Sequence, residues 1–289
     1  MTARHRSLLF VSGERPDRFD KAMASGADVV CIDLEDAVGP AAKDSAREAV
    51  VAFVLARAKA PGTVRLAIRI NAVGTLHGLR DVLALAAGRA APDTLLVPKV
   101  ESPRDAVLLH EWLPDGFGSL VALIETPIGI ERAAQIAAAS RGGAPLLAAL
   151  MLGGADLSME LGAAFSWDGL ASARGRLVNA ARSAGLQAWD VPFIDVADPD
   201  GLRHETRLAL AMGFDCKSAI HPSQIAPVHE AFAPSPADLH WARSVMAVVA
   251  SWEGAGDSAG AAPGAFLFEG RLVDAPLLKR AERILRMVD

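Results

Sequence analysis

The 289-residue sequence lacks most features of secreted, membrane-bound or nucleic-acid-binding proteins. It has only two cysteines, Cys31 and Cys216, and both fall in expected strands, which argues against a disulfide framework or a zinc site. No apolar run reaches the roughly 18 residues of a membrane-spanning helix, and the apolar segment near the N-terminus is too short for a signal peptide. The net charge of −5 argues against general nucleic-acid binding. We therefore expect a cytoplasmic protein with no membrane or nucleic-acid partner.

The stretch from Leu120 to Asp156 contains two apolar runs that each lead to a single acid. VALI leads to Glu125, and AALML leads, after two glycines, to Asp156. An amphipathic segment that begins at Pro127 separates them, so the pattern predicts strand, helix, strand. Continuous apolar strands are typical of parallel sheets, in which both acids would lie at the same end. Two oxygen ligands beside glycines suit Mg²⁺ and a carboxylate-bearing substrate, although each acid could instead cap the helix that follows.

The same alternation of apolar runs and helical patterns continues along most of the chain. A composition of 52% hydrophobic and 22% charged residues is that of a compact globular protein. Eight strands alternating with helices predict an α/β fold, a (β/α)₈ TIM barrel, over a doubly wound open sheet, which usually has fewer strands. The expected strands cover 7–11, 28–36, 63–71, 94–102, 121–124, 148–152, 188–193 and 214–222.

The C-terminal part of the sequence follows a different pattern. We expect a catalytic barrel over 1–232 and an extension over 233–289. The extension is predicted to contain a helix at 235–253, a Gly/Ala-rich linker at 254–264, a hairpin at 265–274 and an amphipathic terminal helix. Such a tail would act as a lid on its own barrel or on that of a neighbouring subunit.

Polar side chains recur at the ends of the expected strands, where TIM barrels place their active sites. Arg69 could neutralise charge on an oxygen near a metal, or pair with the acids after the second strand. Lys99 could form a Schiff base in a metal-free aldolase, or an ion pair. His221 could be a base, or could hydrogen-bond across the barrel mouth. The full set of strand-end candidates is Glu35, Asp36, Arg69, Asn71, Lys99, Glu125, Asp156 and His221.

Several spaced motifs resemble the HpcH/HpaI aldolase and citrate lyase β-subunit superfamily, and within it the CitE-like acyl-CoA lyases. They are RSLLFVSGERPDRFDKA, GADVVCIDLEDAVGPAAKDSAR, RIN, VPKVES, ALIETPIGI, LMLGGADL and KSAIHPSQI. The resemblance runs from Arg6 to about Phe232 and resumes at FEGRLVDAPLLKRAERIL, which covers nearly the whole chain.

The resemblance implies a set of site residues. It implies a TIM barrel that binds Mg²⁺, with Mn²⁺ as a substitute, through Glu125 and Asp156. The arginine that matches Arg69 stabilises a thioester enolate, and the acid that matches Asp274 reaches the site from a neighbouring subunit as an acid/base. Two further positions, Glu35 and Asp36, match an acidic pair that orders the waters of the metal. A homo-oligomer, trimer or hexamer, is expected.

The implied reaction is a retro-Claisen cleavage by a carbon–carbon lyase. A short 3-hydroxyacyl-CoA, such as citramalyl-CoA, malyl-CoA or hydroxymethylglutaryl-CoA, would give acetyl-CoA or a related acyl-CoA and a keto acid. The backbone N–H groups of Gly154 and Ala155 would bind the keto-acid carboxylate. The basic side chains of Arg15, Arg18 and Lys21 would hold the phosphates of CoA. The family commonly has VPG where this chain has Val-Ser-Gly at 11–13.

Two other functions remain open at the level of the sequence. The chain could be the β subunit of a citrate lyase complex, which uses an acyl-carrier thioester instead of free CoA. It could also be a non-catalytic barrel homologue. The tail that carries Asp274 favours the stand-alone lyase, and the complete set of Arg69, Glu125, Asp156 and Asp274 argues against a non-catalytic role.

Overall fold

The computed structural model describes residues 5–59, 62–141, 143–253 and 264–287. The chain separates into two compact units, Met1–His229 and Glu230–Asp289. In the described part of the chain, no helix has the length and apolar character needed to span a membrane.

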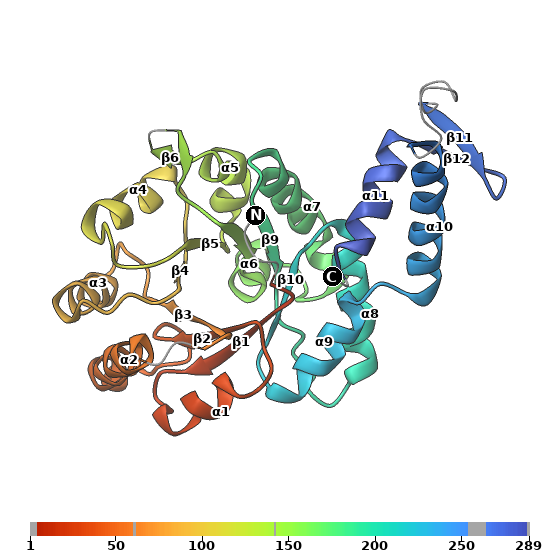
Figure 1. Cartoon of the computed structure of the whole chain (residues 1–289). Coiled ribbons are helices and arrows are strands. Elements are labelled where there is room, and N and C mark those ends of the chain that lie inside the picture. The colour runs from red at the N-terminus through yellow and green to blue at the C-terminus, as the bar shows by residue number, and fades with distance from the viewer. Residues whose placement is uncertain (1–4, 60–61, 142, 254–263, 288–289) are drawn as a thin grey trace. The chain divides into compact units, whose positions relative to one another are not determined.

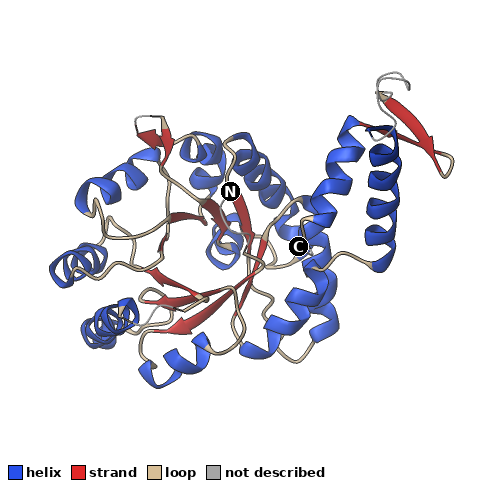
Figure 2. Ribbon diagram, in the orientation of Figure 1, coloured by secondary structure: helices blue, strands red, loops and turns tan. Residues whose placement is uncertain are grey.

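The first unit is a closed barrel of eight parallel strands, which confirms the predicted TIM barrel (Figures 1 and 2). Each strand pairs with its neighbours in chain order, and the last strand pairs with the first. In order around the barrel, the strands are β1 (Ser7–Ser12), β2 (Val29–Asp33), β3 (Arg65–Arg69), β4 (Thr94–Val97), β5 (Leu120–Ile124), β8 (Ala149–Leu152), β9 (Gln187–Asp190) and β10 (Cys216–Ala219).

Helices follow the strands and surround the barrel (Figure 2). Several begin where the sequence predicts, at a polar cap followed by proline. Ser102 caps the helix that starts at Pro103 in a capping box, and Thr126 caps the helix that starts at Pro127. The helices are η1 (Pro16–Arg18), α1 (Phe19–Met23), η2 (Pro40–Ala42), α2 (Lys43–Ala58), α3 (Leu76–Gly88), α4 (Pro103–Trp112), α5 (Pro127–Ala137), α6 (Gly154–Leu161), α7 (Trp167–Ser183), α8 (Pro199–Met212), η3 (Pro222–Gln224) and α9 (Ile225–Phe232).

Side chains alternate along each strand between two apolar clusters. The smaller cluster gathers alternate residues of the strands and fills the barrel, whereas the larger one includes residues of the helices. Cys31, Ala67 and Leu123 belong to the inner cluster. Because successive residues of a strand point to opposite faces, the position two residues further along each strand also faces inward. On β2 and β3, and just after β5, those positions are charged, as described below.

The strands end earlier than the sequence predicts, and one helix begins earlier. The polar residues that complete the expected strands, such as Glu35, Asn71 and Lys99, lie beyond the last strand positions and belong to loops. After β8, α6 starts at Gly154, whereas the segment LSMELGA at 157–163 predicts a short helix only after Asp156. A short antiparallel ribbon, β6 (Ser140–Arg141) and β7 (Ala144–Pro145), precedes β8 and was not expected.

The second unit contains two helices and a hairpin. They are α10 (Pro236–Glu253), β11 (Ala265–Phe268), β12 (Arg271–Asp274) and α11 (Ala275–Leu285). The strands pair antiparallel, as the sequence predicts, and α10 lies beside α11 (Figure 1). Their shared core consists of Ala242, Val245, Val273, Ala281 and Ile284. The predicted linker lies outside the described residues except for its last glycine.

Candidate active site at the barrel mouth

Three inward-facing positions at the carboxyl ends of strands carry charged side chains. Asp33 follows Cys31 on β2, Arg69 follows Ala67 on β3, and Glu125 follows Leu123 at the end of β5. In a parallel barrel these ends meet at one mouth. The strand pattern therefore brings an arginine and two acids together above the apolar barrel core.

The most rigid feature of the mouth is the pair between Arg69 and Asp33. The two residues are register partners on neighbouring strands. Arg69 donates from Nε and Nη2 to the two carboxylate oxygens of Asp33, each at 2.6 Å. Asp33, which is 1% exposed, also accepts the backbone N–H groups of Glu35 and Ala37 at 2.9 and 3.0 Å. This bidentate geometry fixes the plane of the guanidinium.

The remaining face of Arg69 points to two further acids. Its Nη1 lies 3.0 Å from Oε2 of Glu35 and 3.3 Å from Oδ2 of Asp36, and its guanidinium carbon lies 5.3 Å from the centre of the Phe10 ring. Burial alone would lower the pKa of Arg69, but its hydrogen bonds to Asp33 and the neighbouring negative charges outweigh it and raise the pKa. Arg69 therefore carries a permanent positive charge at the mouth.

Glu125 is the most perturbed acid of the site. It is 3% exposed and accepts the backbone N–H of Lys99 at 2.8 Å. Burial, together with the negative charge of Glu35, raises the pKa of Glu125 to about 8. It does not cap α5, because Thr126 does so by accepting the backbone N–H of Gly129 at 3.0 Å. A buried acid with a raised pKa and no helix-capping role is typical of a functional site.

Asp156 lies in the first turn of α6, and Gly153 occupies the cap position without a side-chain cap. Asp156 is therefore not a helix cap either. A Cβ on Gly153 would lie 2.4 Å from both Cβ and Oε2 of Glu125. The missing side chain at this position thus makes room for the Glu125 carboxylate beside the start of α6.

Lys99 links the acids of the mouth. Its Nζ lies 3.2 Å from Oε1 of Glu35 and 3.0 Å from Oδ2 of Asp156. Burial lowers the pKa of Lys99, but the hydrogen bond to Asp156 and the charges of Glu35 and Glu125 outweigh it and raise the pKa. A Schiff-base lysine must be neutral to attack a carbonyl. The ion pairs therefore support the second alternative for Lys99.

A second layer of polar contacts, which the sequence did not single out, holds the loop after β2. Lys43 donates from Nζ to the carbonyls of Leu34 and Glu35 and to Oδ1 of Asn71, each at 2.7 Å. Asn71 donates to the Leu34 carbonyl at 2.9 Å and to Asp81 at 2.7 Å. The predicted candidate Asn71 is thus buried in a structural network, which anchors the loop that carries Glu35.

The other predicted residues are not among the contacts of this group of charges. The side chain of Arg15 is exposed and pairs with Asp17, and Arg18 and Lys21 are exposed on η1 and α1. His221 caps η3 by accepting the backbone N–H of Ser223 at 3.2 Å. Asp274 belongs to the second unit, where it caps α11 by accepting the backbone N–H of Leu277 at 3.3 Å.

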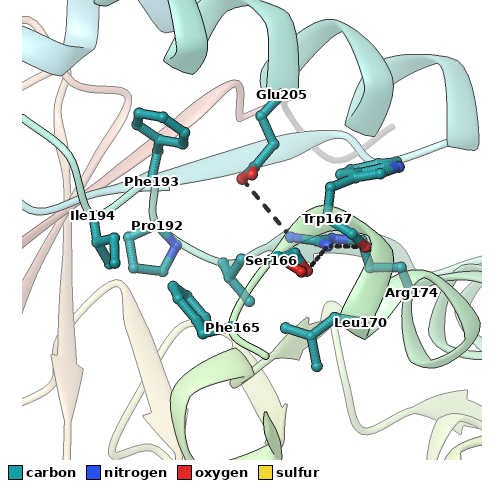
Figure 3. Close-up of a pocket in the computed structure, with 10 residues that line it drawn as sticks. Phe165, Ser166, Trp167, Leu170, Arg174, Pro192, Phe193, Ile194 and Glu205 are labelled. Atoms are coloured by element: carbon teal, nitrogen blue, oxygen red, sulfur yellow. Dashed lines mark hydrogen bonds and ion pairs between the residues drawn. The ribbon is translucent and has the colours of Figure 1, made fainter. Parts of the chain in front are cut away.

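The start of α6 borders a pocket of about 230 Å³ between the loops after α6 and β9 (Figure 3). A Cβ on Gly154 would lie 2.7 Å from Phe165 and from Val191, both of which line the pocket. Arg174 and Glu205, which both line the pocket, form an ion pair at 3.7 Å. Gly154 is therefore a packing position, and the exposed Ala155 follows it in the first turn of α6.

The oxygen donors of the mouth fit a hard divalent cation. Within the residues that the structure describes, no three His, Cys, Asp or Glu side chains form a complete metal-binding group. Mg²⁺ does not need one, because it commonly binds one or two carboxylates and completes its shell with water and substrate. Glu125 and Asp156 would supply the carboxylates. Oε2 of Glu35 is buried and accepts no hydrogen bond despite its ion pair with Arg69, so it could accept one from a metal-bound water.

A TIM barrel with an arginine clamp and oxygen donors at its mouth defines a class of enzymes that stabilise developing negative charge beside a cation. A family model for HpcH/HpaI aldolase/citrate lyase matches residues 6–222. The chain belongs to this family, as its motifs predict, and is thus a lyase.

Individual relatives extend the similarity over almost the full chain. A citrate lyase subunit beta-like protein from Mycobacterium tuberculosis is 39% identical over 285 residues, which are 96% of this chain and 93% of that protein. A mitochondrial citramalyl-CoA lyase from Rattus norvegicus is 31% identical over 304 residues, 98% of this chain and 85% of that protein. The crystal structure of Mycobacterium tuberculosis CitE with magnesium, acetoacetate and coenzyme A covers 99% of both chains with a TM-score of 0.82 and 38% identity.

Proposed function

We propose that this protein is a Mg²⁺-dependent lyase that cleaves a short 3-hydroxyacyl-CoA into acetyl-CoA, or a related acyl-CoA, and a keto acid. The observation that carries this proposal is the juxtaposition of Arg69, fixed by Asp33, with the buried Glu125 that adjoins the start of α6. A lyase of this kind needs a cation near the hydroxyl and carboxylate of its substrate, and a positive charge where the enolate forms. The magnesium, acetoacetate and coenzyme A bound to the related CitE protein support the same assignment.

The residues of the site divide the chemistry between the two halves of the substrate. The proposed acid/base, Asp274, would take the proton of the substrate hydroxyl, the carbon–carbon bond would break, and its electron pair would move into the thioester as an enolate. Arg69 would stabilise the enolate oxygen, and return of the proton from Asp274 to the enolate carbon would complete the acyl-CoA. Glu125 and Asp156 would hold a bound Mg²⁺, which would lower the pKa of the substrate hydroxyl and orient the bond to be broken. Glu35 and Asp36 would order the waters of the ion.

Two further groups of residues would bind the substrate carboxylate and the CoA. The N–H groups of Gly154 and Ala155 open α6 without a side-chain cap, and such groups at a helix start bind anions. Arg15, Arg18 and Lys21 are exposed basic side chains just after β1 and would attract the phosphates of CoA. Asp274 would act as the acid/base from the lid of a neighbouring subunit in a homo-oligomer.

The proposed reaction is tested by incubating the protein and Mg²⁺ with citramalyl-CoA, malyl-CoA and hydroxymethylglutaryl-CoA. We expect at least one of them to release a keto acid and an acyl-CoA in equal amounts, and EDTA to abolish the release. The citryl thioester of an acyl-carrier protein is the second substrate to include. Turnover of that thioester alone would identify a citrate lyase β subunit, and no turnover of any thioester would contradict a catalytic role.

Replacing Gly153 by alanine is expected to weaken Mg²⁺ binding by at least about tenfold, which corresponds to ~1.4 kcal/mol. The added methyl would overlap Cβ and Oε2 of Glu125, so that the carboxylate must move. The backbone of Gly153 has a φ of −100°, outside the left-handed region that favours glycine, so we assign the effect to the steric overlap with Glu125. Isothermal titration calorimetry with Mg²⁺ measures it.

A matched control for this substitution is Gly175 on α7, where an added Cβ would meet nothing within 4 Å. We expect Gly175→Ala to leave Mg²⁺ affinity unchanged and to raise the free energy of unfolding by up to about 1 kcal/mol through helix propensity. Equal Mg²⁺ affinity in the Gly153 and Gly175 variants would show that Glu125 does not bind the ion.

A further inference from the structure

Lys99 contacts all three of the acids Glu35, Glu125 and Asp156. Its ammonium lies within 3.2 Å of Glu35 and 3.0 Å of Asp156, while its backbone N–H donates to Glu125 at 2.8 Å. The charge of Lys99 thus occupies the space beside the carboxylates that the proposed function assigns to a divalent cation.

The backbone of Lys99 adopts a conformation that residues other than glycine disfavour. Its φ is +53°, in the left-handed region that residues other than glycine rarely adopt. The residue lies just after β4, between two buried neighbours, Pro98 and Val100. Unfavourable backbone conformations of this kind cluster at functional sites. The left-handed turn directs the backbone N–H to Glu125 while the side chain reaches Glu35 and Asp156.

We propose that Lys99 is an internal counter-ion, which holds the carboxylates of the mouth together in the metal-free protein and releases Asp156 when a divalent cation binds. This inference rests on the proposed metal site. The lysine side chain has the freedom that the exchange requires, because 40% of it is exposed whereas Glu35 is buried. Its link to Asp156 consists of a single ion pair, so the ammonium can leave Asp156 and stay beside Glu35.

The exchange follows from the charges at the mouth. Like charges repel at close range, so an ammonium and Mg²⁺ cannot share Asp156 without a cost. Without Lys99 or a metal ion, the three acids would face one another beside Arg69, which is already paired with Asp33, and Lys43, which is held by the carbonyls of Leu34 and Glu35. Lys99 therefore stabilises the empty site and competes with the ion that fills it.

The test compares Mg²⁺ binding and thermal stability in the intact protein and in Lys99→Met, Lys99→Gly and Lys99→Arg. Each protein is stripped with EDTA and titrated with Mg²⁺ by calorimetry, and its melting temperature is measured with and without saturating Mg²⁺. We expect Lys99→Met to bind Mg²⁺ up to about tenfold more tightly, because a competing charge is removed. Its metal-free form should melt at a lower temperature, and its rise in melting temperature on adding Mg²⁺ should exceed that of the intact protein.

The other two variants separate charge from backbone effects. Lys99→Gly also lacks the charge but adopts positive φ freely, so it keeps the test valid if the methionine variant does not fold. Lys99→Arg keeps the charge and should retain affinity close to that of the intact protein. If the salt bridges of Lys99 were purely structural, Mg²⁺ binding would weaken in the uncharged variants. Mg²⁺ binding in those variants that equals or falls below that of the intact protein overturns the inference. Failure of the intact protein to bind Mg²⁺ would overturn the metal site itself and, with it, this role of Lys99.

Discussion

Turnover of the hydroxyacyl-CoA substrate is expected to fall about 10²- to 10³-fold when Arg69 is replaced by lysine. Lysine keeps the positive charge, but its single ammonium cannot form the two parallel hydrogen bonds to Asp33 while also facing Glu35 and the substrate. The loss should appear in kcat, because the guanidinium acts on charge that develops only in the transition state. Steady-state assays of keto-acid release measure it, and calorimetry should show Mg²⁺ affinity nearly unchanged.

A second bidentate pair in the same unit provides the control. Arg6 donates from Nε and Nη2 to Asp28 at 3.1 and 2.9 Å, just before β1 and β2 begin, and therefore at the opposite end of the barrel. Arg6→Lys changes the same chemistry far from the mouth and should leave kcat within about twofold, because it touches no group of the site. A similar kcat for Arg69→Lys and Arg6→Lys would exclude Arg69 from enolate stabilisation.

Replacing Asp274 by asparagine is expected to lower turnover about 10²- to 10⁴-fold, the usual contribution of a general acid or base. Asparagine caps helices as well as aspartate does, so the bond to the backbone N–H of Leu277 survives and α11 keeps its start. The substitution therefore removes the proton-transfer group without removing the cap. Mg²⁺ binding, measured by calorimetry, should stay near normal because Asp274 is not assigned to the metal.

The matched control removes another acid from the same unit. Asp238, in the first turn of α10, is half-buried and lies 3.6 Å from Arg280, and Asp238→Asn should leave turnover unchanged. Mixed oligomers of Asp274→Asn and Arg69→Lys test whether the acid crosses between subunits. If it does, some hybrid sites combine an intact Arg69 with an intact Asp274, and activity returns on mixing. Full activity of Asp274→Asn alone would remove Asp274 from the mechanism.

The fold could be predicted because its signals are local. Apolar runs of strand length, prolines at helix starts and polar caps such as Thr126 each act within a few residues, and eight repetitions of the pattern determine a closed barrel. Glu125 stood out for the same reason, since it follows an unbroken apolar strand. The structure supports this expectation by leaving Glu125 buried and without a capping role.

What the sequence could not supply depends on contacts between distant segments. Asp33 was one of three neighbouring acids after the second strand, and only the strand register pairs it with Arg69. The register of the strands could have identified Asp33 as the partner of Arg69, because the two residues end adjacent parallel strands. The contacts of Lys99 depend on a left-handed backbone that nothing in its local sequence indicates. The close approach of Gly153 to Glu125, which follows another strand, is likewise a contact between distant segments.

The closure of the barrel has a consequence for how the protein is made. The strands that carry Asp33, Arg69 and Glu125 leave the ribosome well before β10, yet β1 obtains its second partner only when Cys216–Ala219 has been synthesised. Until then the nascent sheet has open edges at β1 and at its growing end, and such edges invite aggregation. The last strand supplies no acid or arginine to the mouth, but its arrival completes the ring that holds the mouth together. A stalled or truncated chain that ends before residue 216 would therefore contain the charged residues of the mouth without the closed barrel that positions them.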